Sequence, residues 1–209
     1  MTIIVPLLEI VEVEYSLAED RVQSSFEVET KVVLPECGYI QRLREKLTSL
    51  GCTFEKHVVE EDIYYQHPCR DFAKTDEALR IRVVGDRVEL TYKGPKKRVE
   101  GGVKAREEIS ISIASQFEHA KMLLEKLGFK EVMVVRKKRD YYNCGDVVVS
   151  LDQVEKLGCF VELEYRGRGN ASSRLEEVIE KLGLGGLERT TLSYLELLLY
   201  KFGHKCLRG

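Results

Sequence analysis

Two carboxylates and one ammonium group occur at every second position near the start of the chain. The run Phe26–Val32 carries Glu27, Glu29 and Lys31, with other residues between them. In a β-strand, a spacing of two projects side chains from one face and places neighbouring carboxylates about 6–7 Å apart. Such carboxylates suit a hard divalent cation, and a lysine suits phosphate. The alternative is the solvated face of an ordinary half-buried strand, because such triplets are common.

Paired charges of one sign recur on three later segments. They are Arg80 and Arg82, Lys137 and Arg139, and Glu162 and Glu164. A face that is merely solvated usually mixes acids, bases and uncharged polar residues. If these strands instead close into a barrel with the charged faces inward, acids would gather a metal ion and bases would gather phosphate in one cavity. Packed bases repel one another, so we expect alanine at Arg82 or Arg139 not to lower thermal stability.

The composition bounds the class of protein. With 209 residues and 44% hydrophobic content, the chain can bury a core as one large domain or two small ones. No stretch approaches the roughly 18 uninterrupted apolar residues of a membrane span, and the start lacks the basic region of a signal peptide. We therefore expect a cytoplasmic protein without membrane contact. One third of the residues are charged but the net charge is −2, which argues against a nucleic-acid binder with a global basic field.

The cysteines and histidines show no ligand spacing. The six cysteines are Cys37, Cys52, Cys69, Cys144, Cys159 and Cys206. They contain no C-x-x-C pair and no zinc pattern, and the four histidines are scattered. We expect reduced thiols with mostly structural roles, and a disulfide is the alternative.

Hydrophobic periodicity predicts four helices and eight strands. Helices are expected at about 37–50, 115–127, 170–183 and 192–202, the last packed against the outside of a barrel. Strands are expected at about 26–33, 54–66, 78–84, 87–93, 103–113, 130–143, 146–152 and 160–166. This order predicts an α+β fold in which an antiparallel sheet carries its helices outside. The basic loop 93–102 could fold over a polyphosphate or form an ordinary solvated hairpin.

The two halves of the chain resemble each other. Gly128 follows Gly51 by 77 positions, and Tyr142 follows Tyr65 by the same interval. Each glycine ends an expected helix, and each tyrosine lies in the long strand that follows. A duplicated four-stranded unit that closes on itself would give eight strands, the smallest number that leaves room for one small ligand. The alternative is chance similarity between amphipathic segments.

Taken together, these segments resemble the CYTH superfamily of triphosphate tunnel metalloenzymes, most of all the class IV adenylyl cyclases and their archaeal-type relatives. The segments are, in order, Glu27–Lys31, Asp62–Tyr65, Ala78–Arg82, Leu90–Pro95, Lys104–Ile109, Lys137–Arg139, Leu151–Gly158 and Phe160–Glu164. The resemblance spans about residues 26–200. It implies an N-terminal extension at 1–25 and a CYTH domain at 26–209, and the extension is a departure from the family's usual free N-terminal edge.

The resemblance implies an eight-stranded antiparallel β-barrel, a triphosphate tunnel, that binds its substrate with Mg²⁺ or Mn²⁺. The implied metal ligands are Glu27, Glu29, Asp152, Glu162 and Glu164. The implied substrate-binding bases are Lys31, Arg80, Arg82, Lys93, Arg106, Lys137 and Arg139. Of these two sets, Glu29, Lys31 and Arg139 are the expected catalytic residues.

Three functions fit these residues. We favour an adenylate cyclase that converts ATP to cyclic AMP and pyrophosphate. The alternatives are an inorganic or thiamine triphosphatase, and a binding module without catalysis. Acids beside the bases favour an enzyme, because acids weaken anion binding unless a metal intervenes. The expected partner is a nucleoside triphosphate or another inorganic or organic triphosphate, with no nucleic acid and no membrane, and the chain could form a homodimer.

Overall fold

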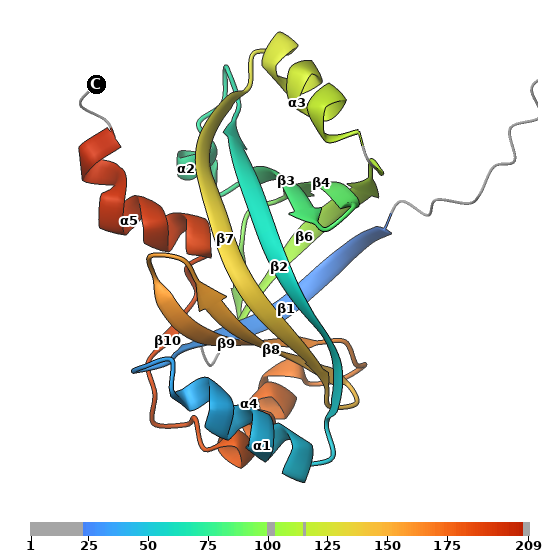
Figure 1. Cartoon of the computed structure of the whole chain (residues 1–209), viewed down its shortest axis with the longest axis vertical. Helices are drawn as coiled ribbons and strands as arrows, with labels where there is room; N and C mark the ends of the chain where they lie inside the picture. Colours follow the sequence, from blue (N-terminus) through green and yellow to red (C-terminus); the bar gives the residue numbers. More distant parts are fainter. Residues whose placement is uncertain (1–22, 100–102, 115, 207–209) are drawn as a thin grey trace, which may run out of the picture.

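The computed structural model describes residues 23–99, 103–114 and 116–206, which form an α+β fold (Figure 1). Its strands are β1 (Gln23–Val33), β2 (Thr53–Gln66), β3 (Ala78–Val84), β4 (Arg87–Lys93), β5 (Lys97–Val99), β6 (Val103–Ser112), β7 (Lys130–Asn143), β8 (Val147–Val154), β9 (Gly158–Tyr165) and β10 (Arg189–Thr190). Its helices are α1 (Tyr39–Ser49), α2 (Phe72–Thr75), α3 (Phe117–Lys126), α4 (Ala171–Leu182) and α5 (Tyr194–Cys206). Eight of the strands coincide closely with the predicted ones. The short elements α2, β5 and β10 were not predicted.

The sheet closes into a barrel. Its strands follow the order β10-β1-β9-β8-β7-β2-β3-β4-β6-β5, and an additional pairing joins β1 to β6. That pairing runs from Gln23 opposite Ser110 to Glu29 opposite Lys104. The eight strands β1, β2, β3, β4, β6, β7, β8 and β9 are therefore closed on themselves, and β5 and β10 add short pairings outside the ring. The predicted eight-stranded antiparallel barrel is confirmed.

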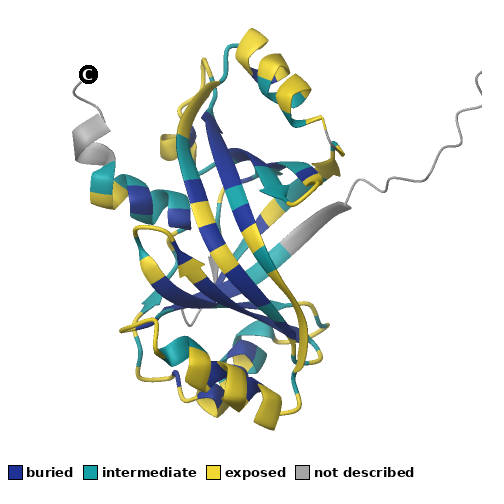
Figure 2. Cartoon of the chain, viewed as in Figure 1, coloured by how far each residue is buried: buried dark blue, intermediate teal, exposed yellow. Residues whose placement is uncertain are grey.

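The main apolar core lies outside the barrel wall, between the strands and two helices. α1 and α4 lie side by side below β8 and β9 (Figure 1). α4 buries Leu175, Val178, Ile179 and Leu182, which form one stripe at helical spacing. Apolar residues of β1, β8 and β9 complete this core, and Figure 2 shows the buried stretches of β8 and β9 above α1 and α4. Because apolar side chains fill the outside, the charged alternate residues of these strands are directed inward.

Helix α4 begins and ends as its sequence dictates. Asn170 lies in an extended conformation and its side chain accepts a hydrogen bond from the Ser173 backbone, which satisfies a donor of the first turn. Gly183 ends the helix in the left-handed region, with φ of 75°.

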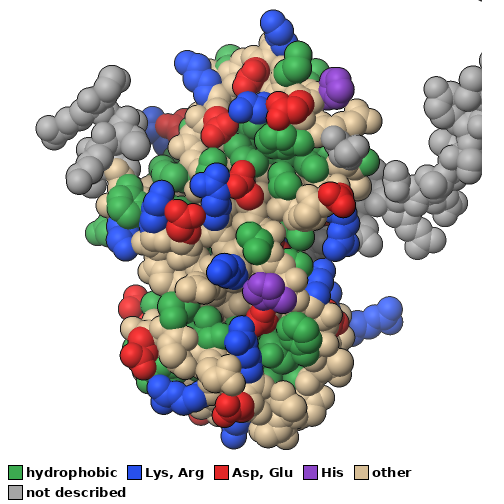
Figure 3. All heavy atoms as spheres, in the orientation of Figure 1, with side chains coloured by type: hydrophobic (Ala, Val, Ile, Leu, Met, Phe, Trp, Pro, Cys, Tyr) green, Lys and Arg blue, Asp and Glu red, His purple; other side chains and the backbone are tan. Residues whose placement is uncertain are grey.

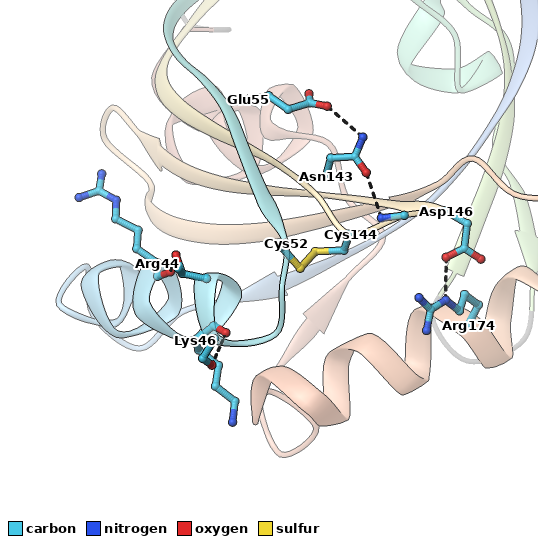
Figure 4. Close-up of a disulfide and its surroundings, with 11 residues drawn as sticks. Arg44, Lys46, Cys52, Glu55, Asn143, Cys144, Asp146 and Arg174 are labelled. Carbon is cyan, nitrogen blue, oxygen red and sulfur yellow. Dashed lines mark hydrogen bonds and ion pairs between the residues drawn. A yellow bond between two sulfur atoms is a disulfide. The ribbon is translucent and has the colours of Figure 1, made fainter.

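Two disulfides correct the prediction of reduced thiols. Cys37 is bonded to Cys159, and Cys52 to Cys144. The first cysteine of each pair lies just before or just after α1, so both ends of this helix are bonded to the barrel. Figure 4 shows the second disulfide, which joins the start of β2 to the turn after β7. The partners are far apart in sequence, so local spacing gave no indication of either bond.

The remaining surface is mixed in character. Acidic and basic side chains are interspersed on the face shown in Figure 3. This agrees with the small net charge of the chain. Among the described residues, no helix has both the length and the apolar character needed to cross a membrane.

Candidate active site

Alternate residues of the barrel strands line a central cavity with a volume of ≈ 70 Å³. Its charged lining residues are Glu27, Glu29, Lys31, Asp62, Arg80, Arg82, Lys93, Lys104, Arg106, Lys137, Arg139 and Glu162. Ten of the twelve residues expected from the sequence are in this lining. The described lining has eight bases and four acids, so its wall carries an excess of positive charge suited to a polyanion.

The two expected metal ligands that do not line the central cavity are Asp152 and Glu164. Asp152 is fully buried, and its carboxylate accepts hydrogen bonds from the Arg139 guanidinium and from the Tyr194 hydroxyl, each at 2.5 Å. Glu164 accepts two hydrogen bonds of 3.0 Å from Arg166. Glu164 also lies opposite Glu29 in the β1–β9 register, so it remains beside the acidic strand.

Acids of β2 lie between the bases of β3 and β7, which corrects the prediction of mutually repelling bases. Arg82 donates to both carboxylate oxygens of Asp62, at 2.6 and 2.7 Å, and also lies 3.0 Å from Glu60. Lys137 lies 2.9 Å from Glu60. Arg139 donates to Asp152 and, at 3.0 Å, to Glu162. Removing one of these bases would take a partner away from a buried acid, so it should lower stability.

The lysines of the cavity are paired in the same way. Lys31 lies 3.1 Å from Glu162, and Lys104 lies 2.5 Å from Glu29. Lys93 contacts Glu27 at 2.9 Å and also forms an ion pair with Glu108. A polyanion entering the cavity must therefore compete with these carboxylates for the bases. A divalent cation on the carboxylates would relieve that competition.

Burial and neighbouring charges shift the pKa values of several residues of the site. Burial would raise the pKa of Glu162, but Arg139 and Lys31 hold it well below the usual range. Burial also raises the pKa of Glu164, and there the negative charges of Glu27 and Glu29 add to the effect although Arg166 opposes it. Lys137 has a lowered pKa because of burial and the nearby Arg139 and Arg82. Acids therefore crowd at β1 and β9, and bases crowd at β7 and β3.

The acidic strands fit a hard divalent cation in ligand chemistry. Glu27, Glu29, Glu162 and Glu164 offer the carboxylate oxygens that Mg²⁺ and Mn²⁺ prefer. Burial is the main cause of the raised pKa of Glu164, and the charges of Glu27 and Glu29 add a repulsion that a cation would relieve. These side chains are held by bases, and no group of three or more potential ligands is already assembled for a metal among the described residues. A metal would have to displace lysine and arginine partners.

Two basic residues differ in what they offer a ligand. The buried Nε of Arg80 has no hydrogen-bond acceptor within the described part of the chain, so it is a donor available to a phosphate oxygen. Arg106 lines the cavity, but its guanidinium donates to the backbone carbonyls of Gly94, Lys93 and Asp76. Arg106 thus anchors the chain after β4, in addition to its expected role in binding substrate.

The start of α5 closes one end of the cavity, which corrects the prediction that this helix packs only on the outside. Ser193 and Tyr194 line the cavity. The Lys31 Nζ lies 4.4 Å from the centre of the Tyr194 ring, and that ring packs against Phe160 with 5.1 Å between centroids. No local pattern places a residue 163 positions after Lys31 in the same site.

The basic loop after β4 is held in place where the structure describes it. Lys97–Val99 form β5 and pair with β6, and Lys96 bridges Glu196 of α5, at 2.6 Å, and Asp76, at 3.0 Å. These residues favour the hairpin alternative over a cover that folds over the substrate. Positions 100–102 lie outside the described residues.

The sequence analysis also left out several residues that belong to the cavity wall or directly support it. Asp62 and Tyr64 on β2 line the cavity, and Glu60 pairs with its bases. Alternation along β2 was the available signal for Glu60 and Asp62. This alternation was hard to recognise, because the opposite face of β2 carries the charged Glu61 and is not uniformly apolar.

The barrel and its lining define a class of protein, in which a closed antiparallel tunnel is lined by paired acids and bases with a surplus of bases. The family model that matches is the CYTH domain, over residues 25–192, and the chain belongs to this family. CYTH tunnel metalloenzymes in general depend on metals and act on triphosphates.

Relatives in sequence and structure agree with this assignment. A protein of Methanocaldococcus jannaschii, provisionally named as an adenylate cyclase, is 40% identical over 82% of this chain and 97% of its own length. Adenylate cyclase CyaB of Aeromonas hydrophila is 28% identical over 66% of this chain and 71% of its own. A solved Pyrococcus horikoshii structure is 40% identical with a TM-score of 0.70, covering 84% of this chain and 99% of its own. A Hippeastrum structure has the same fold, with 21% identity, a TM-score of 0.65 and coverage of 85% and 96%.

Proposed function

We propose that the protein is a metal-dependent enzyme that acts on triphosphates, and that its reaction is the conversion of ATP to cyclic AMP and pyrophosphate. The observation that carries the proposal is the wall of the central cavity, with eight bases and four acids in a member of the CYTH family. The names of the Methanocaldococcus and Aeromonas relatives support the choice of a cyclase.

The bases of the cavity suit a polyanionic substrate. A nucleoside triphosphate carries about four negative charges, and the cavity lining offers eight bases for its phosphates, in competition with the carboxylates that pair with them. Arg80 contributes the free Nε described above, and Arg82 and Arg139 contribute planar guanidinium groups. Lys31 and Lys137 contribute ammonium groups near Tyr194. These side chains would hold the phosphates in place before the reaction.

The carboxylates have a separate task. Glu27, Glu29, Glu162 and Glu164 would hold Mg²⁺ or Mn²⁺, which would neutralise phosphate charge and polarise the nucleophile. Asp152 is also a candidate ligand from its sequence pattern. Because both of its oxygens are engaged by Arg139 and Tyr194, we assign it the task of positioning Arg139.

In the cyclase reaction the ribose 3′-hydroxyl oxygen forms a bond to the α-phosphorus, and the bond from that phosphorus to the pyrophosphate oxygen breaks. The hydroxyl proton passes to a carboxylate of the wall, for which Glu29 is our candidate. Negative charge grows on the departing pyrophosphate, where Lys31 and Arg139 would stabilise it. Glu29→Ala should therefore abolish turnover.

The second candidate function is a triphosphatase, with an inorganic triphosphate or thiamine triphosphate as substrate. Water would attack the terminal phosphorus, and the same bases would stabilise the departing group. The Hippeastrum protein with this fold is described as having a dominant triphosphatase activity. This description supports the triphosphatase alternative, because it assigns that activity to a protein with the same fold.

The decisive experiment is incubation of the purified chain with Mg²⁺ or Mn²⁺ and, separately, ATP, tripolyphosphate and thiamine triphosphate. Cyclic AMP with an equal amount of pyrophosphate would establish a cyclase. Orthophosphate from tripolyphosphate or thiamine triphosphate would establish a phosphatase. Absence of turnover with all three would overturn both and favour a binding module.

A further inference from the structure

The outer face of β2, β3 and β4 is less completely covered than the outer face of β1, β8 and β9. The latter is covered by α1 and α4, which lie side by side (Figure 1). The former packs against α3 and the single turn of α2, and within the described residues α3 has no companion helix. Figure 3 shows hydrophobic side chains gathered just below α3 on this face. Apolar surface therefore remains beside α3.

Helix α3 buries only part of its apolar stripe. The stripe follows the spacing i, i+3, i+4 and i+7 of one helix side and consists of Ala120, Leu123, Leu124 and Leu127. Leu124 is buried, but Leu123 and Leu127 are 61% and 60% exposed. In α1, which lies 77 positions earlier, the residue equivalent to Leu123 is Lys46, a type suited to solvent. The apolar flank of α3 therefore lacks a partner among the described residues.

The sheet beside α3 exposes apolar side chains in the same region. Ile81 of β3, Leu90 of β4 and Ile111 of β6 lie opposite one another in the register and form one row across three strands. Ile81 is fully buried, and Leu90 is half-buried in the cluster that contains Leu124. Ile111 is 44% exposed. The cover over this row therefore ends towards β6.

The first strand of the barrel begins at the exposed end of that row. Gln23, the first residue of β1, lies opposite Ser110 of β6, and Ile111 is the next residue of β6. The 22 residues before Gln23 lie outside the described part of the chain. An extended segment of that length reaches about 70 Å, whereas a helix of ten residues such as α3 is about 15 Å long. The segment is thus joined to the barrel beside the apolar surface and is long enough to cover it.

The composition of this N-terminal segment matches the surface. Within residues 3–13, eight of the eleven residues are Ile, Leu or Val, and none is basic. The CYTH match begins at residue 25, so the segment is additional to the family domain. A covalent tether gives the segment a local concentration of about millimolar. The exposed Ile111, Leu123 and Leu127 fall well short of the roughly 20–30 residues that each partner of a stable complex contributes, which disfavours a second copy.

We propose that residues 3–13 dock on the surface formed by Leu90, Ile111, Leu123 and Leu127. The segment then takes beside α3 the place that α4 takes beside α1. Docking removes apolar side chains of both partners from water and stabilises α3, which has no cysteine near either end to bond it to the barrel. The inference concerns the outside of the barrel and is independent of the reaction in the tunnel.

The test is photo-crosslinking of the purified full chain. Leu123→p-benzoylphenylalanine places an apolar crosslinker on the exposed flank of α3. The matched control is Glu125→p-benzoylphenylalanine, which is exposed on the same helix but about 200° around its axis. Peptide mapping identifies the residues that are joined, and a denaturing gel shows whether the product has the mass of one chain or of two.

We expect the crosslinker at position 123 to join residues 3–13 in a product with the mass of one chain, and the control not to do so. A product of doubled mass would assign the surface to a second copy and overturn the proposal. Failure of position 123 to reach residues 3–13, or equal crosslinking from position 125, would also overturn it. If the melting curve shows that the Leu123 variant does not fold, Leu127→p-benzoylphenylalanine on the same stripe decides.

Hydrogen exchange provides a second test without a crosslinker. The double variant Leu8→Asp and Ile10→Asp should increase exchange at the amides of α3 by about tenfold or more, because two apolar side chains no longer bury their surface there. Exchange in α1 should not change, since α1 is held by disulfides and α4. The double variant Ser16→Asp and Ala18→Asp is the control, because it adds the same charge outside residues 3–13. Unchanged exchange in α3, or an equal increase in the control, would overturn the proposal.

Discussion

The two halves of the barrel have the same topology and opposite charges. The first consists of β1, α1, β2, β3 and β4, and the second of β6, α3, β7, β8 and β9. At the interval of 77 positions, Glu27, Glu29 and Lys31 of β1 correspond to Lys104, Arg106 and Glu108 of β6. Every sign is inverted.

The same inversion holds for the two long strands. Glu60 and Asp62 of β2 correspond to Lys137 and Arg139 of β7, again 77 positions later. Glu60 is also directly opposite Lys137 in the β2–β7 register. Equivalent positions of the two halves therefore meet across the seam between them. The comparison teaches that one repeated backbone can build a cavity with distinct acidic and basic regions when its two copies differ in charge.

The halves differ also in how their helices are held. Disulfides bond both ends of α1 to the barrel, whereas Met122 and Leu123 of α3 and the following Leu127 are exposed by 56%, 61% and 60%. We expect the first helix to depend on covalent bonds and the second on packing alone. The predictions that follow test each difference.

The largest expected effect is on the disulfides. The two bonds span 122 and 92 positions, and cross-links of this length stabilise a chain by about 2–5 kcal/mol each. Urea unfolding with and without a reductant should therefore show a fall of several kcal/mol, and Cys69→Ser should leave the unfolding curve unchanged. Identical curves under both conditions would show that the bonds do not stabilise α1. Disulfides are also rare in reducing compartments outside hyperthermophiles, so this measurement bears on the expected cytoplasmic location.

The next effect tests the charge inversion directly. Glu60→Lys should destabilise the protein by about 3–5 kcal/mol, because it places a buried lysine against Lys137 and Arg82. Adding Lys137→Glu should recover much of this loss, since it restores opposite charges at the seam. Glu61→Lys, on the outer face of the same strand and 38% exposed in its side chain, is the matched control. A double variant as unstable as the sum of its parts would contradict pairing across the halves.

A smaller effect separates binding from stability. Arg139→Ala should weaken tripolyphosphate binding by about 1.5–3 kcal/mol, the scale of a charge-assisted hydrogen bond. It should also lower the melting temperature, because Asp152 loses its buried partner. Lys138→Ala is the control on the exposed face of β7. A variant that melts lower but binds tripolyphosphate normally would remove Arg139 from the site.

The smallest effect is a pH dependence at Glu108. Burial would raise its pKa, but Lys93 and Arg80 lower it from 4.5 to about 2. A carboxyl group with a lowered folded-state pKa contributes stability above its unfolded pKa and loses it as the pH falls towards the folded value. The stability difference between the unmodified chain and Glu108→Gln should therefore narrow from about pH 5 to about pH 2. A constant difference across that range would show that the Glu108 charge does not stabilise the fold.

Local pattern predicted the strands and their paired charges, and the resemblance to the CYTH superfamily implied the closed barrel and most of its charged lining. Strand alternation fixes which face Glu29 or Arg82 occupies, and ten expected residues do reach the central cavity. The ion-pair partners of these residues could not be predicted, because local pattern does not show the strand register that places Arg82 opposite Asp62. The expectation of repelling bases failed for that reason.

Features set by distant segments were also missed. Tyr194 reaches the cavity only because α5 returns to the end of the barrel, and the cysteine partners meet only after the strands have paired. The short strand β10 is defined by its pairing with β1 and has too few residues to show periodicity.

The register that places Glu60 opposite Lys137 has a consequence for the origin of the barrel. Two identical copies of the first half, joined by a two-fold axis at this seam, would place Glu60 against its own copy, and like charges directly opposite on paired strands destabilise a sheet. In a homodimeric ancestor the present acidic strand would therefore have weakened the seam. Fusion of the two copies into one chain removes that constraint, because each copy can then acquire the charge that complements the other.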